Sequence, residues 1–198
     1  MRGSMWSVVL AAFGAGALLA GVPSGMVQPE ESQPEEAGEP SIEELLRAGE
    51  PGPEHELLGR IVGEWDLEMA FEGEEPISGS ATNAWGLGGR FLETEFRLPQ
   101  YFGRPFRGRG ISGFDRVRGV YVNVWMNSFS TQLTMRTGVA DGDQIAFEGT
   151  SYREDGEHPS RVVLRVEGAD RYTETVYDLG ADGVWAQRGR VTFTRRGG

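Results

Sequence analysis

The sequence predicts an all-β protein, an antiparallel up-and-down barrel of about ten strands with a short N-terminal helix that closes one end. Apolar and polar residues alternate in runs such as WDLEMAF at 65–71, the period of a strand with one buried face. Turn dipeptides such as Asp141-Gly142 and Asp155-Gly156 separate the runs. No long helical pattern lies between them, so successive strands are expected to pair as neighbours, in a barrel or a sandwich.

The expected elements follow in chain order. Residues 53–61 (PEHELLGRI) indicate one or two turns of helix, after which the apolar period becomes two. Pairs of turn residues, including Gly88-Gly89 and Asp182-Gly183, mark the ends of strands. The strands are expected at about 63–72, 77–87, 90–97, 105–115, 120–128, 132–139, 144–152, 160–167, 171–179 and 184–195.

Residues 1–25 have the layout of a secretory signal peptide. Arg2 precedes an apolar run that ends in small residues around Val22. The run is short for a membrane span, which needs about 20 strongly apolar residues. We therefore expect an exported protein, periplasmic or secreted, without a stable membrane span. If the segment is not cleaved, it stays as an anchor.

Residues 26–53 are expected to form a disordered linker rich in Pro and Glu, which leaves 54–198 as the folded domain. Residues 27–56 hold ten acidic residues and one basic residue, and such a segment buries too little apolar surface to offset its chain entropy. Within it, Ser41 and Glu44 have the spacing of a capping box for a short helix. The segment is read as a solvated tether, with an acidic recognition tail as the alternative.

Composition excludes several kinds of chemistry. The chain has no Cys and no Lys, and it has two His, so thiolate, Schiff-base and multi-histidine metal sites are excluded. The barrel segment carries a small net charge, without the basic surface of a nucleic-acid-binding protein. We expect no metal and no cofactor, including haem at His158, which is expected in a turn beside Pro159.

Several segments resemble a bacterial family known as domain of unknown function 1579. They are EHELLGRIVGEW (54–65), WGLGGRFLETEF (85–96), FRGRGISGFDRVRGVYVNVW (106–125) and RVTFTRR (190–196). The resemblance covers about 54–196 and implies a lipocalin-like, calycin-type β-barrel, but no activity. Family members often carry Asp in the fifth strand where this chain has Asn127.

The segment Gly63-Glu64-Trp65 also resembles the start of the first lipocalin strand. That resemblance implies that Trp65 lies at the closed end of the barrel, covered by an arginine of the last strand, either Arg195 or Arg196. A guanidinium over an indole contributes about 0.5–2 kcal/mol. We interpret Trp65 and Arg195 as structural.

The expected strand 120–128 has two different faces, and its inward face determines what the barrel can bind. One face is aliphatic, and the other combines aromatic and amide side chains. We predict that the mixed face points inward, because aromatic area with a few polar groups is typical of a ligand pocket. Arg109 could hold an anion if it points inward, or it forms part of a solvated rim, and Trp85 lines the interior or is plain core. The candidate ligand-binding residues are Trp85, Arg109, Tyr121, Asn123, Trp125 and Asn127.

Three functions are consistent with this barrel. The first is binding of a small, mainly apolar or amphipathic molecule in the interior. The second is an enzyme that uses an interior carboxylate, for which the sequence offers Glu93, Glu95, Glu174 and Asp178 without a basis for choice, and no catalytic residue is assigned. The third is a filled, structural barrel that contacts an envelope partner. The sequence does not decide between a monomer and a homodimer.

Overall fold

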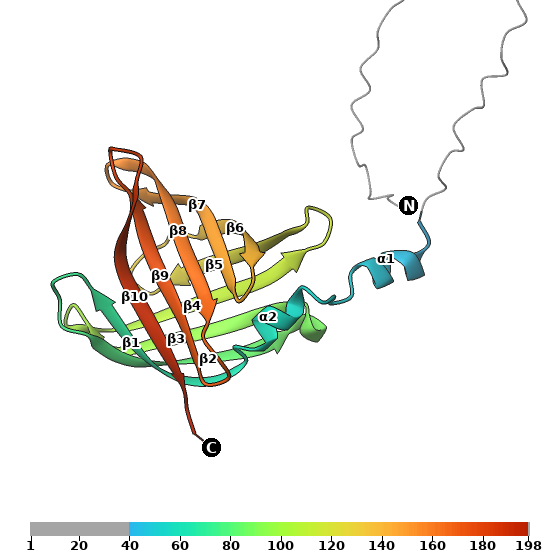
Figure 1. Ribbon diagram of the computed structural model, residues 1–198, viewed down its shortest axis with the longest axis horizontal. Helices are drawn as coiled ribbons and strands as arrows, with labels where there is room; N and C mark the ends of the chain where they lie inside the picture. The colour runs from blue at the N-terminus through green and yellow to red at the C-terminus, as the bar shows by residue number, and fades with distance from the viewer. Residues whose placement is uncertain (1–39, 198) are drawn as a thin grey trace, which may run out of the picture. The chain divides into compact units, whose positions relative to one another are not determined.

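The computed structural model describes residues 40–197, which form a closed barrel of ten antiparallel strands (Figure 1). Each strand pairs with the next in sequence, and β1 pairs with β10 to close the barrel. The expected signal peptide, 1–25, and the first part of the expected linker lie outside the described residues. The strands are β1 (Gly63–Phe71), β2 (Ile77–Gly86), β3 (Phe91–Tyr101), β4 (Arg104–Asp115), β5 (Val120–Asn127), β6 (Thr134–Asp141), β7 (Gln144–Arg153), β8 (Gly156–Val166), β9 (Arg171–Leu179) and β10 (Trp185–Arg195).

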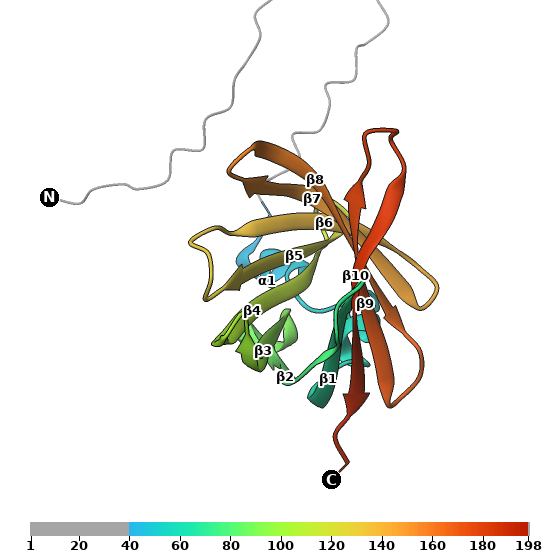
Figure 2. The same cartoon turned by 90° about the vertical axis from the view of Figure 1, so that its left-hand side faces the viewer.

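The predicted up-and-down topology is confirmed, and two strands are longer than expected. β3 continues through Pro99 to Tyr101, where the ladder with β4 is irregular between Leu98 and Tyr101. β8 begins at Gly156 and includes Pro159, and its pairing with β9 starts only at Ser160. Proline has no backbone N–H to donate to a neighbouring strand. Both prolines lie where the pairing with one neighbouring strand is interrupted or has not yet begun, so the missing N–H breaks no regular ladder there. The long hairpin of β7 and β8 can be followed in Figure 2.

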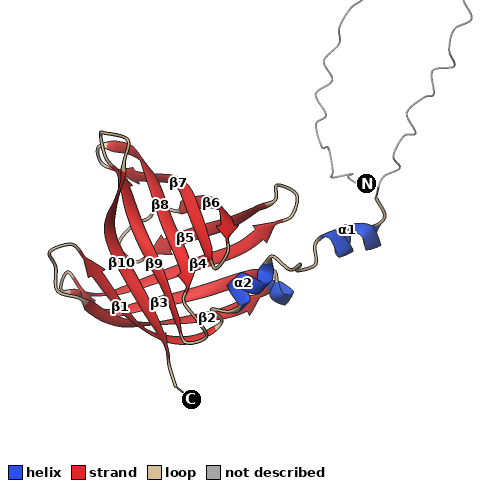
Figure 3. Cartoon of the chain, in the orientation of Figure 1, coloured by secondary structure: helices blue, strands red, loops and turns tan. Residues whose placement is uncertain are grey.

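Short helices lie on the N-terminal side of the barrel (Figure 3). α1 (Ile42–Ala48) has the expected capping box, in which Ser41 and Glu44 bond each other's backbone N–H, and it is exposed along its length. α2 (His55–Gly59) buries His55 and Leu58, and a single 3-10 turn, η1, spans Leu87–Gly89. No helix in the described part of the chain is long and apolar enough to cross a membrane.

The end of the barrel next to α2 is closed by a packed core. Trp65 is fully buried, and its indole N–H donates to the carbonyl oxygen of Ile61 at 2.9 Å. The guanidinium of Arg195 lies 4.2 Å above the Trp65 ring and donates to the carbonyl oxygens of Val62 and Arg60. This is the structural pair expected from the sequence, and Arg195 is the arginine that covers the indole.

Candidate functional site

The mixed face of β5 points into the barrel, as predicted. Asn123, Trp125 and Asn127 line an interior cavity. Tyr121, at the start of the strand, is buried nearer the closed end, where its hydroxyl donates to the carbonyl oxygen of Glu54 at 2.7 Å. The aliphatic residues between them form the outer face of the strand.

The cavity has a volume of about 470 Å³, within the usual range of about 300–1,000 Å³ for small-molecule sites. Most of its wall is apolar and comes from strands all around the barrel. At the end away from α2, the lining includes Phe129, which is partly exposed to solvent. The apolar lining consists of Ile61, Met69, Phe71, Leu92, Phe96, Tyr101, Phe106, Trp125, Phe129, Phe147, Val162, Leu164, Val176, Val191 and Phe193.

Trp125 packs flat against glycines of β4. A Cβ atom at Gly108 would lie 2.2 Å from the indole Cη2, so only glycine leaves room for the ring. At Gly108 and Gly110, the group that lies closest to the place of a Cβ atom, or close beside it, is therefore this indole. The ring centroid of Phe96 lies 5.7 Å away, edge to face. The indole is thereby held as one wall of the cavity.

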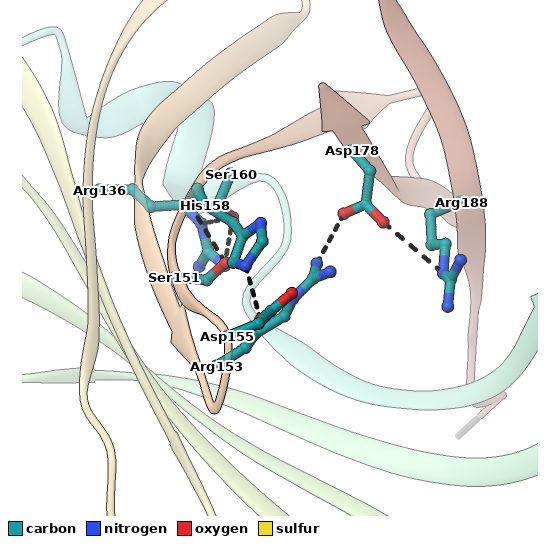
Figure 4. Close-up of polar contacts among 8 residues, drawn as sticks. All are labelled: Arg136, Ser151, Arg153, Asp155, His158, Ser160, Asp178 and Arg188. Atoms are coloured by element: carbon teal, nitrogen blue, oxygen red, sulfur yellow. Dashed lines mark hydrogen bonds and ion pairs between the residues drawn. The ribbon is translucent and has the colours of Figure 1, made fainter. Parts of the chain in front are cut away.

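Four polar side chains from β4, β5, β6 and β8 form a hydrogen-bonded row, and we call Ser112, Asn123, Arg136 and Ser160 the polar stripe. The first three line the cavity. Asn123 Nδ2 donates to Ser112 Oγ at 3.0 Å. Arg136 donates from Nε and Nη2 to Ser160 Oγ at 3.1 and 3.0 Å (Figure 4). Its Nη1 reaches Asn123 Oδ1 at 3.4 Å. The stripe therefore connects four strands through neutral acceptors, with one cation at its centre.

Glu174 is the acidic group inside the barrel. It projects from β9, between Leu164 and Val191 on the paired strands, and it lines the cavity. None of the described residues forms a hydrogen bond or an ion pair with its carboxyl group. Protein surrounds most of the side chain, and part of its surface faces the cavity. This is the buried carboxylate beside a cavity that an enzymatic function would require.

Burial controls the protonation of the interior charges. Loss of solvation raises the pKa of Glu174 to about 7, and the positive charge of Arg136 lowers it in part. Burial also lowers the pKa of Arg136, while Glu174 raises it. Arg136 keeps its charge, because even a lowered guanidinium pKa lies far above neutrality. Near neutral pH, Glu174 therefore holds a proton for part of the time.

Three of the six residues expected to bind ligand lie outside the cavity. Arg109 is on the outer face of β4, exposed, and donates to Glu95 at 3.1 Å, so it belongs to the solvated surface. Trp85 lies under α2, with its ring 6.1 Å from that of His55. Tyr121 bonds the backbone before α2. These three side chains are therefore not part of the cavity lining, and Arg109 has the solvated position that the sequence analysis gave as its alternative.

Asn127 lines the cavity and also shapes the turn that follows β5. Its Oδ1 accepts from the N–H of Phe129 at 2.9 Å. An aspartate would offer the same acceptor, so the turn accommodates either residue.

The histidines do not form a catalytic triad. His158 lies in β8 rather than in a turn, and its Nε2 is 2.8 Å from Asp155, while the Ser151 hydroxyl reaches the His158 backbone oxygen (Figure 4). His55 is buried, and its Nδ1 accepts from the N–H of Gly52. No serine hydroxyl is therefore bonded to a histidine ring in the described residues.

The other acidic candidates are on the surface or at its edge. Asp178 accepts from Arg153 at 3.0 Å and lies 3.7 Å from Arg188 (Figure 4). Glu95 pairs with Arg97 and Arg109, and Glu93 is exposed. Among residues 40–197, no group of three or more acidic or histidine side chains is arranged to hold a metal ion.

Sequence reasoning missed Arg136 as a site residue. It stands in the run TMRTGVA, where Met135, Thr137 and Val139 alternate with Arg136 and Gly138. The apolar residues of this run are on the outer face, with Met135 and Val139 exposed. In this strand the apolar face is outside and the polar face is inside, the reverse of the usual arrangement. The sequence of one strand alone does not reveal that reversal, because a charged residue on the polar face is expected to meet solvent.

Comparison with known proteins agrees with this fold. The sequence model of the family described as "Protein of unknown function (DUF1579)" matches residues 50–195. The crystal structure of Rv2717c from M. tuberculosis is 15% identical with a TM-score of 0.51, and the match covers 75% of this chain and 100% of that one. A de novo designed fluorescence-activating β-barrel is 16% identical with a TM-score of 0.41, over 70% of this chain and 95% of the design. No curated protein matches the sequence significantly. At 15% identity, the likeness to Rv2717c indicates the fold alone.

Proposed function

Because this chain belongs to the DUF1579 family, whose description gives no activity, we propose its function from the barrel interior: it binds a small, mainly apolar molecule. The observation that carries the proposal is the cavity of about 470 Å³. A filled structural barrel would pack Met69, Phe71, Phe147 and Leu164 against one another, whereas here all four line open space. An apolar wall of this size favours a ligand, since burying its surface stabilises a complex by about 25 cal/mol per Å² before the costs of association.

Trp125 is the residue best suited to test this proposal. It contributes a rigid aromatic wall to the cavity and is only partly buried. We expect Trp125→Ala to weaken binding of the neutral fluorescent probe N-phenyl-1-naphthylamine by roughly tenfold or more, as a lost aromatic contact does. Fluorescence titration measures the affinity, and urea unfolding measures the stability.

The matched control is Trp185→Ala, since Trp185 lies at the start of β10 and stacks under Arg161 outside the cavity lining. It should leave probe affinity unchanged. If the wild-type protein takes up no probe, the proposal fails. If Trp125→Ala lowers stability but binds the probe as the wild type does, the ligand does not occupy this cavity.

Glu174 favours a second candidate function, acid–base catalysis on a bound molecule. A carboxyl group whose pKa is near 7 can both accept and donate a proton at neutral pH. Native mass spectrometry with a solvent extract identifies a co-purified molecule, and that molecule is then incubated with wild-type protein and with Glu174→Gln. Conversion by the wild type alone supports catalysis, and an unchanged molecule with both proteins excludes it.

Export is part of the proposal and rests on the sequence of residues 1–25. Expression of the full chain in a bacterial host, followed by cell fractionation and intact-mass measurement, tests it. A periplasmic product shortened by about the length of this segment supports export. A full-length product in the cytoplasm contradicts it.

A further inference from the structure

The cavity contains a cation that the protein itself does not neutralise through a direct contact. Arg136 is largely buried, and its hydrogen-bond partners are the neutral oxygens of Ser160 and Asn123. A guanidinium has five N–H donors, and these contacts use three of them. No ion pair with Arg136 forms among residues 40–197. The two remaining donors are therefore available at the wall that Arg136 and Asn123 share with the cavity.

Glu174 is the group that sets the net charge of this interior. With Glu174 ionised, the charges of Arg136 and Glu174 cancel, and with Glu174 protonated the cavity carries one positive charge. The other ionisable groups that line the cavity or adjoin Glu174 are two phenols, Tyr101 of β3 and Tyr172 of β9, both of whose pKa values are raised by burial. On the two strands paired with β9, the residues opposite Glu174 are the apolar Leu164 and Val191. The interior thus has one charge that is always present and one that is switchable.

Resting on the proposed function, we propose that the ligand is an amphipathic monoanion, whose charged group contacts Arg136 while its apolar body lies against Trp125, and that Glu174 binds one proton from solvent as the anion enters. A carboxylate or a similar small oxyanion fits the two free guanidinium donors. An anion placed in the same cavity as an ionised Glu174 would be repelled by it in a medium of low dielectric constant. Taking up a proton at Glu174 removes that repulsion and leaves the cavity neutral once the ligand is bound.

The test compares two ligands that differ in charge and share one apolar chain. Decanoate and decan-1-ol each compete for the cavity against N-phenyl-1-naphthylamine, at pH 6 and at pH 8. These values lie on either side of the Glu174 pKa of about 7. We expect decanoate to bind roughly tenfold more weakly at pH 8 than at pH 6, because binding requires the protonated fraction of Glu174. Decanol binding should not change with pH.

Two interior variants separate the parts of the proposal. Glu174→Gln should remove the pH dependence and bind decanoate at pH 8 as tightly as the wild type does at pH 6. Arg136→Gln should lose the preference for decanoate over decanol at pH 6. The controls are Glu95→Gln and Arg109→Gln, an ion pair on the outer face, and neither should alter the competition.

The outcomes distinguish this inference from the proposed function. Probe uptake with equal competition by decanoate and decanol at pH 6 overturns the anion site and leaves the binding function intact. A decanoate preference that is independent of pH in the wild type overturns the role of Glu174. Failure of the wild type to bind the probe overturns both. Because N-phenyl-1-naphthylamine is neutral, its binding by each variant shows that the variant is folded with its cavity intact.

Discussion

At the scale of single residues, the cavity depends on the fit between Trp125 and Gly108. We expect Gly108→Ala to push the indole from its place, because the new Cβ would lie 2.2 Å from the ring. Overpacking of this kind costs about 1–3 kcal/mol, and N-phenyl-1-naphthylamine should bind more weakly. Urea unfolding and probe titration measure the two effects.

Gly110→Ala is the matched control on the same strand. A Cβ there would meet the Trp125 ring at 3.5 Å and Thr94 at 3.4 Å, which are ordinary contacts. It should therefore cost less stability than Gly108→Ala and, although Gly110 also lines the cavity, lower the probe affinity less. Equal effects of the two substitutions would show that backbone freedom, rather than the indole, explains the glycines of β4.

The sequence predicted some of these residues and could not predict others. The alternation at Tyr121, Asn123 and Trp125 identified a mixed face, and a ligand-binding barrel needs such a face inside. Arg136 and Glu174 gave no comparable signal, since a charge in an alternating strand usually faces solvent. Their meeting in one cavity depends on β6 and β9 lying in the same closed barrel, 38 positions apart in sequence.

At the scale of elements, the β3–β4 hairpin combines tight geometry with an unusual residue. Its turn places Phe102 at φ +48° and Gly103 at φ +77°, a conformation that suits Asn or Gly and strains an aromatic residue by about 1–3 kcal/mol. Phe102 is 78% exposed, so little packing is lost on its removal. We expect Phe102→Asn to stabilise the protein by about 1 kcal/mol in urea unfolding.

Phe102→Ala is the control for that prediction. Alanine also removes the exposed ring but keeps a Cβ atom without the local hydrogen bonding that helps Asn at positive φ. It should stabilise the protein less than Phe102→Asn does. A larger gain from alanine would mean that the exposed ring, and not the backbone conformation, is the destabilising feature.

The elements themselves were largely predictable. All ten strands were expected near their observed positions because period-two alternation and Gly-containing turns are local signals. The extensions of β3 through Pro99 and of β8 through Pro159 were not expected. A proline interrupts a strand only where a neighbouring strand would accept a hydrogen bond from its N–H. Whether such a neighbouring strand is present depends on the assembled sheet, which the local sequence does not show.

At the scale of the whole molecule, Glu174 links stability to pH. Its pKa is about 7 in the folded protein against 4.5 for the free side chain, so the folded state binds more protons than the unfolded state between these values. Stability therefore falls as pH rises through this window, by up to roughly 3 kcal/mol above pH 7. Glu174→Gln cannot ionise and should not show that fall.

Urea unfolding of both proteins at pH 5, 6, 7 and 8 tests this linkage. The difference between the variant and the wild type should grow with pH and level off above the Glu174 pKa. Glu95→Gln is the control, because Arg97 and Arg109 lower the pKa of that exposed carboxyl and place its titration below this range. Curves that stay parallel from pH 5 to pH 8 would show that Glu174 is not protonated in the folded state.

The packed core under α2 has a consequence for kinetics. Leu58, Ile61 and Trp65 are buried at that end, so the proposed ligand would enter and leave the cavity at the opposite end, where Phe129 lies. A competing ligand could not displace the bound one through the closed end, so exchange would require the bound ligand to dissociate first. In a stopped-flow chase, the observed rate should therefore be the same at every excess of the competing molecule.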